Sequence, residues 1–178
     1  NIFFWRGEIQ PLALGSQRWG RMTLPNLILF NEYGGDWARY EDALYAQFDQ
    51  DILQHNLRFR GAKVTATRTP EHERKWAGFW HLISEGRVED DRTPDLRRCE
   101  RLAWVRWIIE NEARCAEIDV WQNRRGREQN TLLWLGEEYL VVLASRQQNF
   151  LLKTAYCTDR NHRVQKLRKE RDAAWNAP

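Results

Sequence analysis

One histidine stands out as a candidate for proton transfer. His81 interrupts the otherwise apolar stretch 76–83, between Trp80 and Leu82. Histidine suits a general acid or base because the ordinary pKa of its side chain lies near operating pH. The alternative is a hydrogen-bonded core residue, and both interpretations stay open. The remaining histidines are expected to be solvated: His55, His72 and His162.

Two hydroxyl side chains lie close together near the end of the last predicted strand. Thr154 and Tyr156 alternate with Lys153 and Ala155, so a regular strand would place the two pairs on opposite faces. A face that carries Thr and Tyr is less apolar than a core face and is suited to lining a cleft. There the hydroxyls would bind phosphate or position a nucleophile, and Lys153 is a candidate phosphate ligand. An ordinary solvent-facing Thr–Tyr pair, with Lys153 at an edge, is the competing interpretation.

Four arginines gather around the start of a predicted helix: Arg92, Arg97, Arg98 and Arg101. Guanidinium groups bind phosphate bidentately and stabilise the negative charge that develops during phosphoryl chemistry. Arg97 and Arg101 are four residues apart and would share one helix face. Asp95 and Glu100 lie nearby, so a salt-bridged surface is the competing interpretation.

A second basic group lies in a predicted hairpin loop and consists of Arg124, Arg125 and Arg127. Such a loop would contact backbone phosphate without reading sequence, or would simply keep the hairpin soluble. The chain carries a net charge of +3, which is distributed unevenly. Residues 1–91 hold 11 Lys/Arg and 13 Asp/Glu, whereas residues 92–178 hold 17 and 12. The basic second half favours a polyanionic partner.

These candidates must be positioned by a sheet and its covering helices. Four segments rich in β-branched, aromatic and large apolar residues predict an antiparallel meander: 118–121, 131–135, 139–143 and 150–156. Apolar residues at three- and four-residue steps predict helices that begin after Asp36 and after Asp95, and a third covers about 163–174. We therefore expect an α+β fold with about four antiparallel strands packed against helices. Residues 1–35, broken by Pro and Gly, are predicted to form an irregular N-terminal arm, and residues 36–178 the main domain.

Four of these segments carry a resemblance to a known group of enzymes. They are Phe79–Ile83, Arg92–Arg98, Tyr139–Leu143 and Leu151–Tyr156. With the order helix, basic helix, meander, basic helix, they resemble the barnase–EndoU–colicin–RelE superfamily of ribonucleases. Within it they are similar to nucleases associated with phages and mobile elements. The resemblance covers roughly residues 36–175.

The resemblance implies a toxin-like endoribonuclease that cleaves RNA by attack of the 2′-hydroxyl on the phosphodiester, with no metal or other cofactor. It implies catalytic roles for His81, Arg98, Thr154 and Tyr156. The remaining arginines named above and Lys153 would then bind substrate. RNA, either tRNA or mRNA, and an inhibitory protein are the partners it implies. The alternatives are a non-catalytic RNA-binding or protein-interaction module of the same fold, or a regulator whose arm docks on another protein.

Other features of the sequence bear on membrane association, on the state of the cysteines and on other classes of enzyme. Nothing approaches 18 consecutive apolar residues, so we expect no transmembrane helix and no membrane partner. The three cysteines, Cys99, Cys115 and Cys157, form no CxxC pair and are expected to be reduced thiols of a cytoplasmic protein. The sequence also lacks the HExxH, GxSxG, P-loop and GxGxxG motifs.

Overall fold

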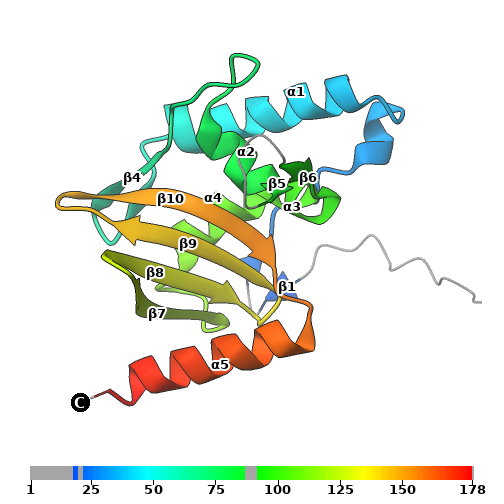
Figure 1. The fold of residues 1–178 in the computed structure, drawn as a ribbon. Coiled ribbons are helices and arrows are strands. Elements are labelled where there is room, and N and C mark those ends of the chain that lie inside the picture. The colour runs from blue at the N-terminus through cyan, green and yellow to red at the C-terminus, as the bar shows by residue number, and fades with distance from the viewer. Residues whose placement is uncertain (1–17, 20–21, 87–91, 178) are drawn as a thin grey trace, which may run out of the picture.

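The computed structural model describes residues 18–19, 22–86 and 92–177. These residues form a mixed α+β structure built around one large sheet (Figure 1). Among them, no helix combines the length and apolar character needed to cross a membrane.

The main sheet has six strands in the order β3-β4-β10-β9-β8-β7 and curves into a half-barrel (Figure 1). Its strands are β3 (Arg58–Phe59), β4 (Ala62–Ala66), β7 (Ile118–Arg125), β8 (Glu128–Leu135), β9 (Tyr139–Ser145) and β10 (Asn149–Cys157). Strands β7 to β10 form the predicted antiparallel meander, but β4 pairs with β10 in parallel. The expectation of about four antiparallel strands is therefore wrong. The short β3–β4 hairpin extends the sheet, and a parallel partner of β10 comes from far away in the chain.

Two further strand pairs are short and lie outside the main sheet. They are β1 (Arg18–Trp19) with β2 (Met22–Thr23), and β5 (Ser84–Glu85) with β6 (Thr93–Pro94).

The helices follow the apolar periodicity closely. They are α1 (Trp37–Phe48), α2 (Ala77–Ile83), α3 (Leu96–Glu100), α4 (Leu102–Asn111) and α5 (Asn161–Trp175), with a 3₁₀ turn at Phe30–Tyr33 and a π-helical turn at Asp49–Gln54. Asp36 and Asp95 cap α1 and α3 by accepting hydrogen bonds from the backbone N–H groups of Arg39 and Arg97. The helix predicted after Asp95 is broken at Arg101, where φ is −101° and ψ is 14°. This break separates α3 from α4.

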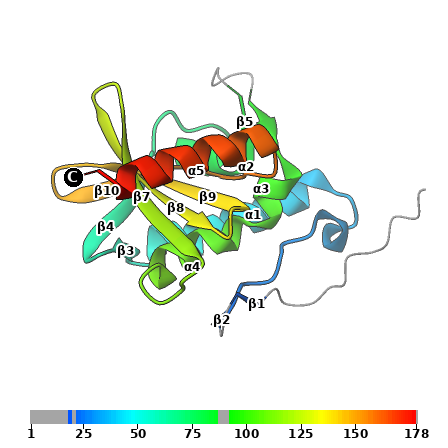
Figure 2. The ribbon, with the colours of Figure 1, turned by 90° about the horizontal axis from the view of Figure 1, so that it is seen from below.

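The two faces of the sheet are covered by different helices. Leu133, Val141 and Leu143 pack with α1, α2 and α4 in the main apolar cluster. On the opposite face, Leu167 of α5 packs against Trp121 and Trp134 in a smaller cluster. Figure 2 shows α5 lying across this second face, with α1 on the other side of the sheet.

The part of the predicted N-terminal arm that follows β2 packs on the helices. Leu24 is buried in the main cluster, and the indole N–H of Trp104 donates to the Pro25 carbonyl at 2.9 Å. Tyr40 donates to the Ile28 carbonyl at 2.7 Å. Most of residues 1–21 lies outside the described residues, so the division at residue 35 stays a prediction.

Candidate functional site

Strand β10 has a free edge where β4 ends. β4 pairs only with residues 149–152 of β10, and beyond them α2 takes the place of a neighbouring strand. The hydroxyl of Thr154 donates to the carbonyl oxygen of His81 at 3.0 Å, which ties this edge to α2. Gly78 allows the close approach of α2, because a Cβ there would lie 2.9 Å from the Cβ of Ala66. Residues far apart in the sequence are thereby brought to one place.

A β-bulge at Lys153 changes which side chains share a face. Leu152 pairs with Leu143 and Thr154 with Val142, so Lys153 is the extra residue. Leu152 and Ala155 point into the main core, whereas Lys153, Thr154 and Tyr156 line a pocket together. The predicted alternation, which placed Lys153 on the face opposite Thr154 and Tyr156, is therefore wrong. That prediction assumed a regular strand without a bulge.

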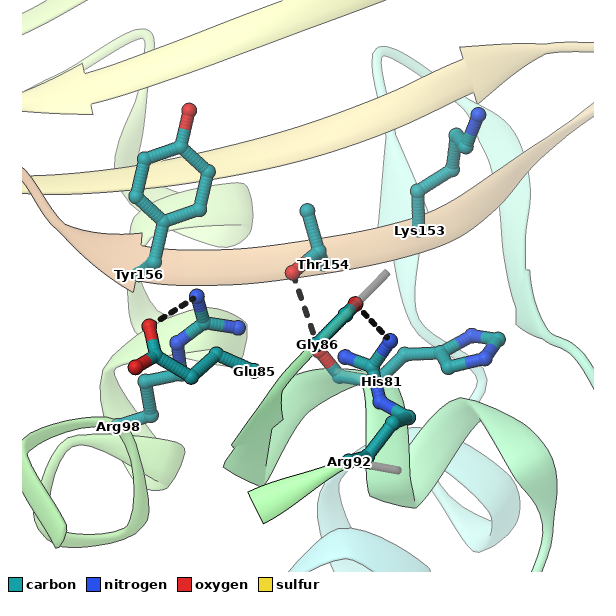
Figure 3. Close-up of a pocket in the computed structure, with 8 residues that line it drawn as sticks. All are labelled: His81, Glu85, Gly86, Arg92, Arg98, Lys153, Thr154 and Tyr156. Carbon is teal, nitrogen blue, oxygen red and sulfur yellow. Dashed lines mark hydrogen bonds and ion pairs between the residues drawn. The ribbon is translucent and has the colours of Figure 1, made fainter. Parts of the chain in front are cut away.

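An open pocket of about 340 Å³ lies between this strand and the helices on its free edge. Figure 3 shows its lining, which consists of His81, Glu85, Gly86, Arg92, Arg98, Lys153, Thr154 and Tyr156. His81 is half-buried, so it lies neither deep in the core nor on the far side of the sheet from Tyr156. In Figure 3 its imidazole and the Tyr156 ring flank Thr154. His81, Thr154 and Tyr156 therefore line one pocket, while their catalytic roles stay predictions.

The two arginines of the pocket are held by one backbone carbonyl. Arg98 donates to the Ser84 oxygen at 2.6 Å, and Arg92 donates to the same oxygen at 2.8 Å. Arg92 also donates to the Ser84 hydroxyl at 3.0 Å, and Arg98 lies 3.3 Å from a carboxylate oxygen of Asp95. These contacts fix two guanidinium groups in the pocket before any ligand binds, and they reduce the reorganisation that anion binding would need.

Tyr156 lies between cations. The guanidinium of Arg98 is 5.5 Å from the centre of its ring, and that of Arg163 is 5.2 Å away. Burial raises the pKa of Tyr156, partly offset by Arg163, Arg125 and Arg98. The phenol therefore stays protonated at neutral pH and can donate a hydrogen bond to an anionic oxygen.

Lys153 is joined to the neighbouring hairpin by a carboxylate. Glu128 accepts hydrogen bonds from Lys153 and, at 2.9 Å, from Arg146. These hydrogen bonds, from Lys153 first and then Arg146, lower the pKa of Glu128. The ammonium group is thus positioned at the pocket's edge but is partly neutralised.

Several predicted site residues lie elsewhere. Arg97 pairs with Asp159, and Arg101 lies over the ring of Trp104; both line a separate hollow near Glu137. Successive side chains of a helix point about 100° apart, so Arg97 points away from its neighbour Arg98, and Arg101 lies on the side of Arg97. Arg124 and Arg127 are exposed in the β7–β8 hairpin and line none of the principal pockets formed by the described residues. A role for these four in the pocket is not supported, although contacts with a longer substrate stay a prediction.

The sequence reasoning missed Glu85, which lines the pocket and lies 3.9 Å from the Arg98 guanidinium. Its side chain is 61% exposed, so it can approach a ligand. A signal was present, since Glu85 follows His81 by only four residues. Glu85 was not predicted, because its approach to Arg98 depends on how α2 and α3 pack together.

A more enclosed hollow of about 150 Å³ adjoins the pocket and shares Lys153, Thr154 and Tyr156 with it. Leu132 and Val142 supply apolar surface, and Asn123, Asn130 and Arg125 supply polar groups. Asn123 donates to Glu170 at 2.7 Å and accepts from Asn130 at 3.2 Å, so the orientation of both amides is fixed. An apolar surface edged by amides suits a planar, hydrogen-bonding ring such as a nucleobase.

No group of three or more His, Cys, Asp or Glu in the described part of the chain is arranged to hold a metal ion. Compared with known proteins, the chain matches no family model, no curated protein and no solved structure.

Proposed function

We propose that the protein is a metal-independent endoribonuclease whose scissile phosphate binds in the pocket between β10 and α2. The observation that carries this proposal is the lining of that pocket. It combines an imidazole, a carboxylate, two anchored guanidinium groups, a lysine and a protonated phenol. The resemblance to toxin-like nucleases of phages and mobile elements supports the same activity.

The chemistry requires a base, an acid and charge stabilisation. Glu85 takes the proton from the 2′-hydroxyl, whose oxygen attacks phosphorus. His81, in its protonated form, gives a proton to the departing 5′-oxygen, leaving a 2′,3′-cyclic phosphate. Arg92, Arg98 and the Tyr156 hydroxyl stabilise the phosphorane oxygens.

Thr154 has a different role in this proposal from the one the resemblance implies. Its hydroxyl donates to the His81 carbonyl, so it acts as a positioning residue that holds α2 against β10. The adjoining hollow with Leu132 and Asn123 would take the base next to the scissile bond.

The test is cleavage of total RNA and tRNA by the purified protein, with and without EDTA. We expect cleavage that persists in EDTA and follows a bell-shaped dependence on pH. Glu85→Gln should remove the acidic limb of that profile, because the base that must lose its proton is gone. No cleavage of any RNA by the folded protein would overturn the nuclease proposal and favour a non-catalytic RNA-binding module.

A further inference from the structure

A second cluster of cations lies beside the proposed active site, where α5 begins. It lines a hollow of about 310 Å³ together with Arg98, Tyr156 and Leu167. Its members are the cations Arg125, Arg163 and Lys166, with His162 beside them, and we name this group the α5 cation cluster. None of the described residues that line this hollow carries a carboxylate.

The charges of this cluster are less compensated than those elsewhere on the same helix. Arg168 and Arg171, on another side of α5, pair with Glu137 and Asp119. Within the described chain, Lys166 and Arg163 form no ion pair, and Arg125 only approaches Glu170 at 4.0 Å. Uncompensated cations brought together in a hollow repel one another, and a bound anion relieves that repulsion.

The cluster is continuous with the proposed active site. Arg98 and Tyr156 line both hollows, and the Tyr156 ring lies between the guanidinium groups of Arg98 and Arg163. Anions bound in the two hollows would therefore be neighbours separated by one aromatic ring. Successive phosphates of a single strand satisfy that arrangement, and a single small anion does not.

We propose that the α5 cation cluster is a second phosphate subsite, which binds the phosphate next to the scissile one in a single-stranded RNA. This inference rests on the proposed function in taking RNA as its ligand. It makes an oligoribonucleotide, rather than a dinucleotide with one phosphate, the preferred substrate. It also gives His162, Arg163 and Lys166 a role that the sequence did not suggest.

Binding tests this proposal without relying on cleavage. The probe is a fluorescent, fully 2′-O-methylated RNA decamer, which lacks the attacking hydroxyl and stays intact. Lys166→Glu should weaken binding about tenfold at low salt, because it reverses a charge that contacts phosphate. Lys169→Glu makes the same charge change one helical turn away, at an exposed position outside the hollow, and should weaken binding clearly less than Lys166→Glu does, because it removes no direct contact with phosphate.

Salt dependence gives a second measurement. Lys166→Ala should reduce the slope of log K against log salt by about 0.7, the value expected for one contact with single-stranded phosphate. Lys169→Ala should leave the slope unchanged.

A scan with methylphosphonates then identifies the partner of Lys166. Each linkage of the decamer is made neutral in turn, and each probe is measured with the wild-type protein and with Lys166→Ala. We expect one linkage at which neutralisation weakens wild-type binding but has no further effect on the variant, because both changes remove the same contact.

The outcomes separate the two proposals. Cleavage that persists while Lys166→Glu and Lys169→Glu behave alike would overturn the subsite and leave the nuclease standing. Lys166-dependent binding without any cleavage would leave the subsite standing and overturn the nuclease. If the effect of neutralising a linkage and the effect of Lys166→Ala add at every linkage, Lys166 acts through general electrostatics. The subsite proposal would then be wrong.

Discussion

The two faces of the sheet differ in how completely they are covered. Facing α1 and α4, Leu133, Val141 and Leu143 are fully buried. On the other face, Leu140 of β9 is fully buried beneath α5, but Val142, two residues further along, is half-buried and lines a hollow. The same strands therefore build a sealed core on one side and a partly open surface on the other.

The two faces therefore have different roles. The sealed face holds the apolar area that stabilises the fold, whereas the open face holds the cations and hydroxyls, whose close grouping brings no obvious stability. Substitutions on the open face should change the binding or cleavage of RNA, and substitutions on the sealed face should change the free energy of unfolding. The following predictions test this separation.

The largest effect is expected for His81→Ala. Loss of the proposed acid should slow RNA cleavage by about 10²–10⁴-fold. The melting temperature should stay close to that of the wild type, because the side chain is half-buried at the pocket's edge. Initial rates and thermal denaturation measure the two quantities, with His72→Ala as the control, since His72 lies outside the pocket. A lowered melting temperature with activity falling only in proportion to folded protein would instead make His81 a structural residue.

On the sealed face, Leu133→Ala should lower the free energy of unfolding by about 2–5 kcal/mol, since it leaves a cavity in a close-packed core. Val142→Ala, which removes less apolar volume from the half-open face, should cost clearly less. Urea denaturation of both variants gives the comparison. Equal losses would show that the open face contributes to stability as much as the core does.

The smallest effect concerns Glu128 on the open face, which accepts from Lys153 and Arg146. Its pKa is lower in the folded protein than in the unfolded chain, so its contribution is complete above the unfolded pKa and disappears as pH falls through the folded one. Glu128→Gln should therefore cost about 0.2–1 kcal/mol at neutral pH. At a pH below the folded pKa, the variant and the wild type should be equally stable. Urea titrations at the two pH values test this, and a difference that persists in acid would contradict it.

Local patterns in the sequence predicted the elements well. The four strands of the meander and the helices after Asp36 and Asp95 follow from apolar periodicity and capping, which depend on near neighbours. The pairing of β4 with β10 was not predicted, because the residues of a five-residue strand do not specify the strand with which it pairs.

The site was predictable only in part, and for the same reason. His81, Arg98, Thr154 and Tyr156 were chosen by residue type, and they do line one pocket. The position of Lys153 depends on a bulge, and the exclusion of Arg97 and Arg101 depends on which side of α3 faces the pocket. Tertiary packing brings Glu85 to the pocket and the α5 cation cluster to the adjoining hollow, and no local pattern in the sequence predicts such packing.

The place of β10 within the sheet also bears on how the protein is made. β10 is an interior strand, yet it comes after every other described strand in the sequence, and Thr154 contacts the His81 carbonyl across 73 residues of chain. A nascent chain still holding β10 in the ribosomal exit tunnel has neither the middle of its sheet nor one wall of its pocket. The pocket can therefore form only after β10 has left the tunnel. For a chain that would attack RNA, this order of events protects the ribosome-bound message from its own unfinished product.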